Sequence, residues 1–400
     1  MKLTACLLSI ATTTAAMAAP AAPNPVEAHE QYVAWVALSR ARITLQQAME
    51  IARSRAPAGV VVEAELGLDG ELPIFDVEFL AGPTRTEVRI EAISGKVLKI
   101  DTDTEDDADD IRERERTARL VSSGKLSLPE AIAAALREVP EGLIHEAELE
   151  IDDGQGIYEI ELMKGDRFFE VELDLATGKV LQVEDETAVD TLWSFEVQVS
   201  VGKFPEGWVI QATNGPANAS WQVVVDRSAP RREHVLALTR TTNRGGTYNL
   251  AIARKITARD LDLRVRVRAD AGDEDQGGGP VWRYQDENNY YICRINPLES
   301  NYRVYKVVNG KRQQLHSADV DLDEDIWYDL RVVMVGEQIT CFLDGKPLLE
   351  AKDNAIRRPG KVGLWTKADA ATSFDNLAIL PLDPASARAK QGGATEPAAP

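Results

Sequence analysis

The feature that most restricts the fold of this chain is an internal repeat in its first half. Residues 43–100 align with residues 126–183 at a constant offset of 83 positions, without a gap. The opening segment ITLQQAMEIARSRAPAG matches LSLPEAIAAALREVPEG, and the closing segment SGKVLKI matches TGKVLQV. Because similar sequences adopt similar folds, the repeat predicts two separate modules that superpose on each other, each with its own sheet.

Each copy has the pattern of one helix followed by four short strands. Capping-box residues predict the start of the helix, Thr44 with Gln47 in the first copy and Ser127 with Glu130 in the second. In the second copy, alternating strands are predicted over 146–151, 157–163 and 167–173, before a Thr-Gly-Lys turn and a last short strand. One helix packed on an antiparallel sheet buries both apolar faces, so each copy is predicted to be a small α+β unit.

This pattern resembles the PepSY family, and the resemblance covers both copies almost end to end, over residues 41–104 and 123–187. The resemblance implies a protein partner such as a peptidase, because the family occurs in propeptides of secreted metallopeptidases and in exported proteins. The segment from His145 to Leu149, HEAEL, lacks the second histidine of the helical zinc motif. No metal site is therefore predicted there.

The acidic charge is concentrated in the same half of the chain. The formal net charge is -20; residues 1–190 hold 38 acidic and 18 basic residues, and residues 191–400 hold 27 of each. Such a polyanionic half disfavours nucleic acid and anionic membranes as partners. The acidic run 105–122 between the copies is predicted to be a solvated linker, helical in its Arg/Glu part, rather than a calcium site.

The first residues have the pattern of a secretory signal. Met1-Lys2 precedes an apolar stretch that ends in Ala16-Met17-Ala18, which predicts a signal peptide over residues 1–18 and a periplasmic or secreted protein. No later apolar run reaches the ~18 residues that a membrane helix needs. The tail over residues 383–400 is rich in Ala, Gly and Pro and is predicted to be disordered.

From Leu192 onward the pattern is that of an all-β domain. Its clearest part lies between Gly277 and Val308, where antiparallel strands are predicted over 282–285, 290–296 and 302–308. If Gln285 faces Tyr290 across the first turn, one face is apolar and belongs to the core, with Trp282, Tyr284, Tyr291, Cys293 and Ile295. The opposite face then carries Arg283, Gln285, Tyr290, Arg294 and Asn296.

The segments GGGPVWRYQDENNYYICRINPLE and GKVGLWTKADAATSFDNL resemble the 3-keto-disaccharide hydrolase family, and the paired strands from Trp327 resemble concanavalin A-like and laminin-G-like sandwiches. The resemblance implies an all-β jelly-roll sandwich of concanavalin A-like type over residues 190–382. Cys293 and Cys341 each alternate with apolar neighbours. Both are therefore predicted to lie in the core, as free thiols rather than as a disulfide.

A second alternating stretch, from Lys361 to Asp369, completes a predicted binding face. Trp365 falls on its polar side together with three charged residues, Lys361, Lys367 and Asp369. With the first stretch, this face offers rings to stack on sugar faces and charged groups to bond hydroxyls. The predicted ligand-binding residues are Arg283, Tyr290, Arg294, Trp365, Lys367 and Asp369. No metal ion or cofactor is predicted.

The leading functional hypothesis is an exported, non-catalytic binding protein. Its sandwich holds a glycan or related ligand, and its PepSY-like modules contact or restrain a protein partner such as a peptidase. The first alternative is a hydrolase acting on a 3-keto-disaccharide or another glycoside, with Asp369 and Asp375 as candidate catalytic residues. Asp319, Asp321 and Asp323 also alternate, but a turn is expected there. The second alternative is a structural protein of the cell envelope.

Overall fold

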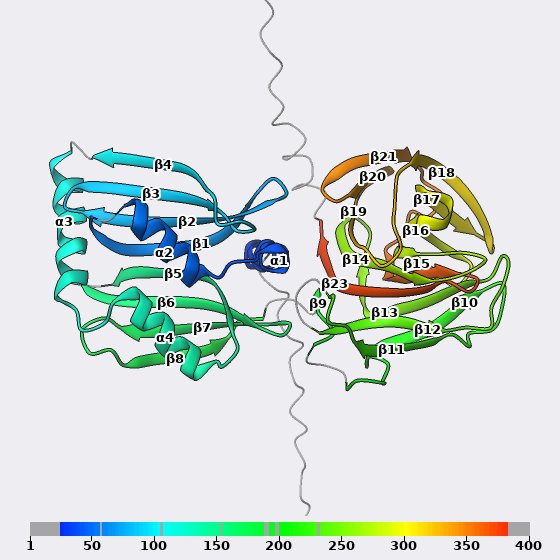
Figure 1. Cartoon of the computed structure of the whole chain (residues 1–400), viewed down its shortest axis with the longest axis horizontal. Helices are drawn as coiled ribbons and strands as arrows, with labels where there is room; N and C mark the ends of the chain where they lie inside the picture. The colour runs from blue at the N-terminus through cyan, green and yellow to red at the C-terminus, as the bar shows by residue number, and fades with distance from the viewer. Residues whose placement is uncertain are drawn as a thin grey trace, which may run out of the picture.

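The computed structural model describes residues 25–56, 58–104, 107–152, 154–187, 192–196, 200–229 and 233–382. Figure 1 shows two bodies side by side, with helix α1 (Pro25–Arg40) between them. The first body is α+β and the second is an all-β sandwich, so the predicted fold class is confirmed. The predicted signal peptide, 1–18, and the predicted disordered tail, 383–400, lie outside the described residues.

The first body contains both copies of the repeat, each a helix followed by four strands. Besides α1, its helices are α2 (Leu45–Arg55), α3 (Ala108–Ser123) and α4 (Leu128–Glu138). Its strands are β1 (Val60–Asp69), β2 (Leu72–Ala81), β3 (Thr84–Glu91), β4 (Val97–Thr104), β5 (Leu143–Asp152), β6 (Gln155–Lys164), β7 (Arg167–Asp174) and β8 (Val180–Asp185). Both predicted capping boxes are present, since the backbone N–H of Thr44 donates to Gln47 and that of Ser127 donates to Glu130.

The two copies share one continuous sheet, so the prediction of two separate sheets is wrong. The strand order is β4-β3-β2-β1-β5-β6-β7-β8, and residues 63–65 of β1 pair with residues 146–148 of β5 in antiparallel register. Two isolated modules would each leave the first strand as an open edge. Joining the edges satisfies their backbone N–H and C=O groups. The repeat itself is confirmed, because both copies have the same strand order outward from this join.

Both modules bury apolar side chains between the sheet and a helix. The equivalent residues Ala48 and Ala131 are fully buried in one common core. From Ala108 onward, the segment predicted as a linker is the regular helix α3, and it buries Val121 against Val62 on the opposite face of the sheet. No helix in the described part of the chain is long and apolar enough to cross a membrane.

The second body consists of two packed antiparallel sheets. Their orders are β10-β13-β22-β15-β16-β17-β18 and β11-β12-β23-β14-β19-β20-β21, with β9 paired to β23. The elements are β9 (Leu192–Trp193), β10 (Trp208–Thr213), β11 (Ser220–Val225), β12 (His234–Arg240), β13 (Tyr248–Ala258), β14 (Leu261–Ala271), β15 (Gly278–Asp286), β16 (Asn289–Asn296), the 3-10 helix η1 (Pro297–Glu299), β17 (Asn301–Val308), β18 (Lys311–Asp319), β19 (Trp327–Val335), β20 (Gln338–Leu343), β21 (Lys346–Lys352), β22 (Gly360–Lys367) and β23 (Ala371–Pro381). Cys293 and Cys341 are fully buried in the core between the sheets and are not bridged, which confirms the prediction.

A bulge in β15 changes one of the predicted faces. Between Trp282 and Asp286, three residues of β15 lie opposite the single residue Tyr290 of β16. Arg283 has a φ of 46° within this bulge. Tyr284 was predicted to lie in the core between the sheets, and this prediction is wrong. Tyr284 instead packs against Tyr290 with ring centroids 6.0 Å apart. We call this side of the seven-stranded sheet, turned away from the inter-sheet core, the outer face.

The two bodies are joined by a shared core and by a charged network. Ala378 and Leu380 of the sandwich belong to the apolar core of the first body. Nearby, Glu71 in the turn between β1 and β2 forms ion pairs with three arginines, Arg40 of α1 and Arg264 and Arg331 of the sandwich. The first body thus packs on the side of the eight-stranded sandwich sheet that is turned away from the inter-sheet core. It leaves the outer face of the other sheet uncovered.

Candidate functional site

Two surfaces gather side chains with functional chemistry. One is the outer face of the seven-stranded sheet, where the sequence predicted a ligand groove. The other belongs to the first body and is the side of its sheet turned away from α2 and α4, which we call the glutamate face. The sequence did not single out this second surface.

Three of the predicted ligand-binding residues, Tyr290, Arg294 and Trp365, come together on the outer face. Tyr290 and Trp365 are 0% exposed and Arg294 is 1% exposed. The two rings belong to a cluster with Tyr248, Tyr284, Tyr305 and five aliphatic residues. The outer face is therefore filled by its own aromatic rings and does not form an open groove at these positions.

Arg312 of the edge strand β18 covers the ring cluster. Its guanidinium carbon lies 4.4 Å from the ring centroid of Tyr305, 5.3 Å from that of Tyr248 and 5.8 Å from that of Trp365. Aromatic faces attract cations, which explains this position. The Nη1 atom of Arg312 is buried without a hydrogen-bond partner. Arg312 thus occupies the space in which a ligand would stack on these rings.

Contacts from the end of β10 close the outer face. Asn214 donates from Nδ2 to the carbonyl oxygen of Gly310 in the β17–β18 turn, at 3.0 Å. The hydroxyl groups of Thr213 and Tyr290 share a hydrogen bond of 2.7 Å. Since β10 and β18 are opposite edges of the same sheet, these contacts curl the sheet around the ring cluster.

Arg294 is held by polar neighbours at one end of the ring cluster. It donates to Asn301 Oδ1 at 3.0 Å and to Glu299 Oε2 at 2.9 Å, while its Nε is buried without a partner. Burial acts to raise the pKa of Glu299, but the hydrogen bonds from Arg294 and Asn301 and the charge of Arg303 lower it to about 2. Glu299 is consequently a charged partner of the arginines at neutral pH.

Lys367 and Asp369 anchor the loop that precedes β15. The ammonium group of Lys367 pairs with the carboxylate of Asp275. The carboxylate of Asp369 accepts hydrogen bonds of 3.1 Å from each of three backbone N–H groups, those of Asp273, Glu274 and Asp275. Burial acts to raise the pKa of Asp369, but these backbone hydrogen bonds lower it. Both side chains have a structural task in this loop.

Arg283 and Asp375 lie away from the ring cluster. Arg283 donates to Asp260 and to three backbone carbonyl groups, those of Arg259, Gly336 and Ile356. Asp375 faces the first body, where it lines a cavity of about 10 Å³ with Leu143 and Met163. Such a cavity holds about one water molecule. Asp369 and Asp375 therefore do not converge on one substrate.

On the glutamate face, the strand register aligns carboxylates in two rows. The first row is Glu65, Glu146, Glu161, Glu170 and Glu184, and the second is Glu63, Glu148, Glu159 and Glu172. Like charges directly opposite each other on neighbouring strands destabilise a sheet. Burial, followed by repulsion from neighbouring glutamates, raises the pKa of Glu146 to about 8 and the pKa of Glu159 to about 7.

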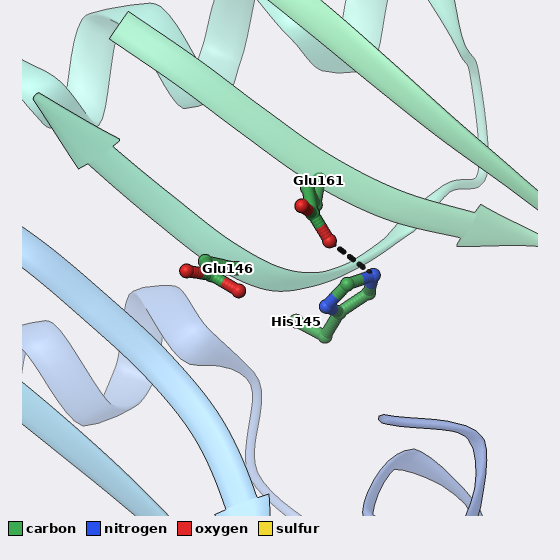
Figure 2. Close-up of side chains that lie close together, drawn as sticks. All are labelled: His145, Glu146 and Glu161. Atoms are coloured by element: carbon green, nitrogen blue, oxygen red, sulfur yellow. Dashed lines mark ion pairs between the residues drawn. The ribbon is translucent and has the colours of Figure 1, made fainter. Parts of the chain in front are cut away.

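His145 joins the first row because β5 contains a bulge. Ile144 pairs with Leu162 and Glu146 pairs with Glu161, so His145 is an inserted residue that lies on the same face as Glu146. Figure 2 shows His145, Glu146 and Glu161 together, with His145 Nε2 3.5 Å from Glu161 Oε2. One ligand atom from each of the three side chains lies within 4.8 Å of the others.

Sequence reasoning missed this group because it tested only the spacing of a helical zinc motif. On a strand, consecutive residues such as His145 and Glu146 share a face only at a bulge. The repeat carries a signal for it, since Val62 occupies the equivalent position of β1 and is also an inserted residue. That signal can be recognised once the register of β1 and β2 is known.

Comparison with protein families divides the chain in the same way as the structure. Residues 42–101 and 125–184 each match the PepSY family, described as the peptidase propeptide and YPEB domain. Residues 197–380 match the 3-keto-alpha-glucoside-1,2-lyase-like domain. The chain therefore carries two PepSY domains followed by a domain of the 3-keto-disaccharide hydrolase type, as the resemblances indicated. No curated protein matches the chain.

Solved structures that resemble the chain include a carbohydrate-binding module, CBM66, from Bacillus subtilis. It is 17% identical, with a TM-score of 0.36, over 43% of this chain and 94% of that one. A Bacillus subtilis protein with a galectin-like fold is 11% identical, with a TM-score of 0.32, over 43% and 88%. The GH43 protein BlXynB from Bacillus licheniformis is 14% identical, with a TM-score of 0.34, over 80% and 65%. These likenesses are too distant to bear on function.

Proposed function

We propose that this chain, with its two PepSY domains and its 3-keto-alpha-glucoside-1,2-lyase-like domain, is an exported protein that binds a saccharide without cleaving it. The saccharide site is the outer face of the sandwich. The PepSY domains contact a protein partner, such as a peptidase. The family match over residues 197–380 supports a saccharide as the ligand class, and the signal-like sequence over residues 1–18 supports export.

We favour binding over cleavage because of the charge state of two carboxyl groups near the outer face. A glycosidase needs one carboxyl group that is protonated before the reaction and a second that is charged. Glu299 has a pKa of about 2 and pairs with Arg294 and Arg303. Asp369 is bonded to three backbone N–H groups. Both carboxyl groups therefore favour the charged form, which disfavours either of them as the general acid of a glycosidase.

The ligand enters by replacing Arg312 over the rings. Arg312 is only partly buried and belongs to an edge strand, and no hydrogen bond of its Nη1 is lost when it turns outward. This movement uncovers Tyr248, Tyr305 and Trp365, on which a sugar ring can stack. The unpartnered Nε of Arg294 then supplies a donor for a sugar oxygen.

A glycan array probed with the full chain tests this proposal. Arg312→Ala removes the side chain that covers the rings, so binding of the best glycan should tighten several-fold. Lys311→Ala is the matched control, because Lys311 is the exposed neighbour on the same strand and should leave affinity unchanged. Failure of both the wild type and Arg312→Ala to bind any glycan would contradict the proposal.

A second candidate function is cleavage of a 3-keto-glucoside, and the family description favours it. It predicts that a 3-keto-disaccharide is converted to monosaccharides, with the products separated by chromatography. Asp369→Asn should then abolish turnover while sparing affinity. In a pure binding protein no product forms, and the same substitution weakens the loop before β15 instead.

A further inference from the structure

His145, Glu146 and Glu161 form a compact set of potential metal ligands on the glutamate face (Figure 2). His145 is 4% exposed, and the ring of Phe168 packs against it in an edge-on arrangement with centroids 5.6 Å apart. Two ligands of a tetrahedral zinc ion, each ~2.0–2.2 Å from the metal, lie roughly 3.4 Å apart. The 3.5 Å between His145 Nε2 and Glu161 Oε2 agrees with this spacing.

The first module supplies an internal control for this set. There the positions of Glu146 and Glu161 are taken by Glu63 and Glu78, which pair across β1 and β2, and Arg85 forms an ion pair with Glu78. At the position of Arg85 the second module has Phe168, and at the position of Val62 it has His145. The second module therefore lacks the arginine that pairs with Glu78 in the first. It has instead an imidazole beside the equivalent glutamates.

A second arginine of the first module is also replaced in the second module. In the first module Arg89 pairs with Asp76 through two hydrogen bonds of 2.9 Å. The equivalent residues of the second module are Glu172 and Glu159, which face each other across β6 and β7. At these two positions the second module thus lacks the arginines that pair with carboxylates in the first, and a bound cation would replace them.

We propose that His145, Glu146 and Glu161 bind a divalent transition-metal ion, with Zn²⁺ as the best fit. One imidazole nitrogen and two carboxylate oxygens match the ligand preference of zinc, and three protein ligands leave a fourth position for water or for a side chain of a partner protein. Calcium is a poor fit because it prefers six to eight oxygen ligands and does not favour imidazole.

Titration of the full chain with ZnCl₂, followed by calorimetry, tests the site. The wild type should bind one equivalent of Zn²⁺. Glu161→Gln and His145→Gln should each weaken binding at least about tenfold. Glu172→Gln, which removes a charge from the second row of the same face, is the control and should leave zinc affinity within about twofold. Co²⁺ in place of Zn²⁺ should give visible absorption bands of a four-coordinate site, and these bands should be absent from Glu161→Gln.

His145 is buried, so a loss of zinc binding in His145→Gln does not separate a lost ligand from an unfolded module. The side chain of Glu161 is 35% exposed, so Glu161→Gln keeps the test decisive. The inference is overturned if the wild type binds no zinc, or if Ca²⁺ binds as tightly as Zn²⁺. It is also overturned if Glu172→Gln weakens binding as much as Glu161→Gln. Equal binding of Ca²⁺ and Zn²⁺, or equal effects of these two substitutions, would indicate diffuse attraction by an acidic surface rather than a defined site. None of these outcomes bears on glycan binding by the sandwich.

Discussion

The two PepSY modules have the same topology but balance charge in opposite ways. At four equivalent positions the first module has Val62, Glu71, Arg85 and Arg89, and the second has His145, Gly154, Phe168 and Glu172. The strand order outward from the join is nevertheless identical. The fold of a module is therefore set by its apolar alternation and its helix start, while the charged positions are free to serve docking or binding.

The environments of two glutamates illustrate the difference. Glu71 of the first module is surrounded by Arg40, Arg264 and Arg331; burial acts to raise its pKa, but hydrogen bonding to Arg264 and the three positive charges lower it to about 2. Burial and neighbouring glutamates raise the pKa of Glu146 in the second module to about 8. The first module thus uses a carboxylate to hold the sandwich, whereas Glu146 of the second module has no arginine or lysine partner among the described residues.

The largest expected effect comes from removing the charge that docks the first module. Glu71→Gln leaves Arg264 and Arg331 without their shared carboxylate in a mostly buried junction. Breaking a buried ion pair from one side costs about 3–5 kcal/mol. Because Glu71 is partly exposed, the expected loss in the free energy of unfolding is about 3 kcal/mol. Chemical denaturation measures it.

Glu150→Gln is the control for this substitution, because Glu150 is exposed on the second module. Its free energy of unfolding should stay within about 0.5 kcal/mol of the wild type. A loss below about 1 kcal/mol for Glu71→Gln would mean that the apolar core alone holds the two bodies together, and the contrast between the modules would lose its functional meaning.

A smaller effect of the same origin is expected on acidification. The pKa of Glu71 is lowered in the folded protein, so its stabilising contribution is fully present above its ordinary pKa of 4.5 and is lost as the pH falls toward 2. The difference in unfolding free energy between the wild type and Glu71→Gln should therefore shrink by on the order of 2 kcal/mol between pH 5 and pH 2.5. Thermal unfolding of both proteins in parallel cancels the titration of other carboxyl groups. A difference that stays constant with pH would contradict the assigned pKa.

The sequence predicted those features that depend on local pattern. The repeat, both capping boxes and the burial of Cys293 and Cys341 follow from spacing and alternation, and the structure has them. The features it did not predict depend on which strands meet. The join of β1 to β5 and the bulges at His145 and Arg283 are set by pairing between distant segments.

The candidate sites show the same division. Alternation correctly separated Trp365 from the inter-sheet core, but it gave no sign that Arg312, more than 50 positions earlier, would cover the ring. Likewise, alternation places each glutamate of the second module on one face. Only the register between β5, β6 and β7 shows that they stand directly opposite one another.

The smallest expected effect comes from giving the second module the ion pair of the first. Glu172→Arg places a guanidinium opposite Glu159, as Arg89 lies opposite Asp76. Replacing a like-charge pair by an opposite-charge pair across a sheet should stabilise the protein by about 0.5–1 kcal/mol. Salt should raise the melting temperature of the wild type by screening the glutamate rows, and it should do so less in Glu172→Arg.

The reverse substitution, Arg89→Glu, is the matched control in the first module. It creates a like-charge pair with Asp76, so it should lower the melting temperature and increase the stabilisation by salt. If instead Glu172→Arg lowers the melting temperature and Arg89→Glu leaves it unchanged, the carboxylates of the two modules are equally well balanced. The second module would then need no external cation, because no repulsion between its carboxylates would be measurable.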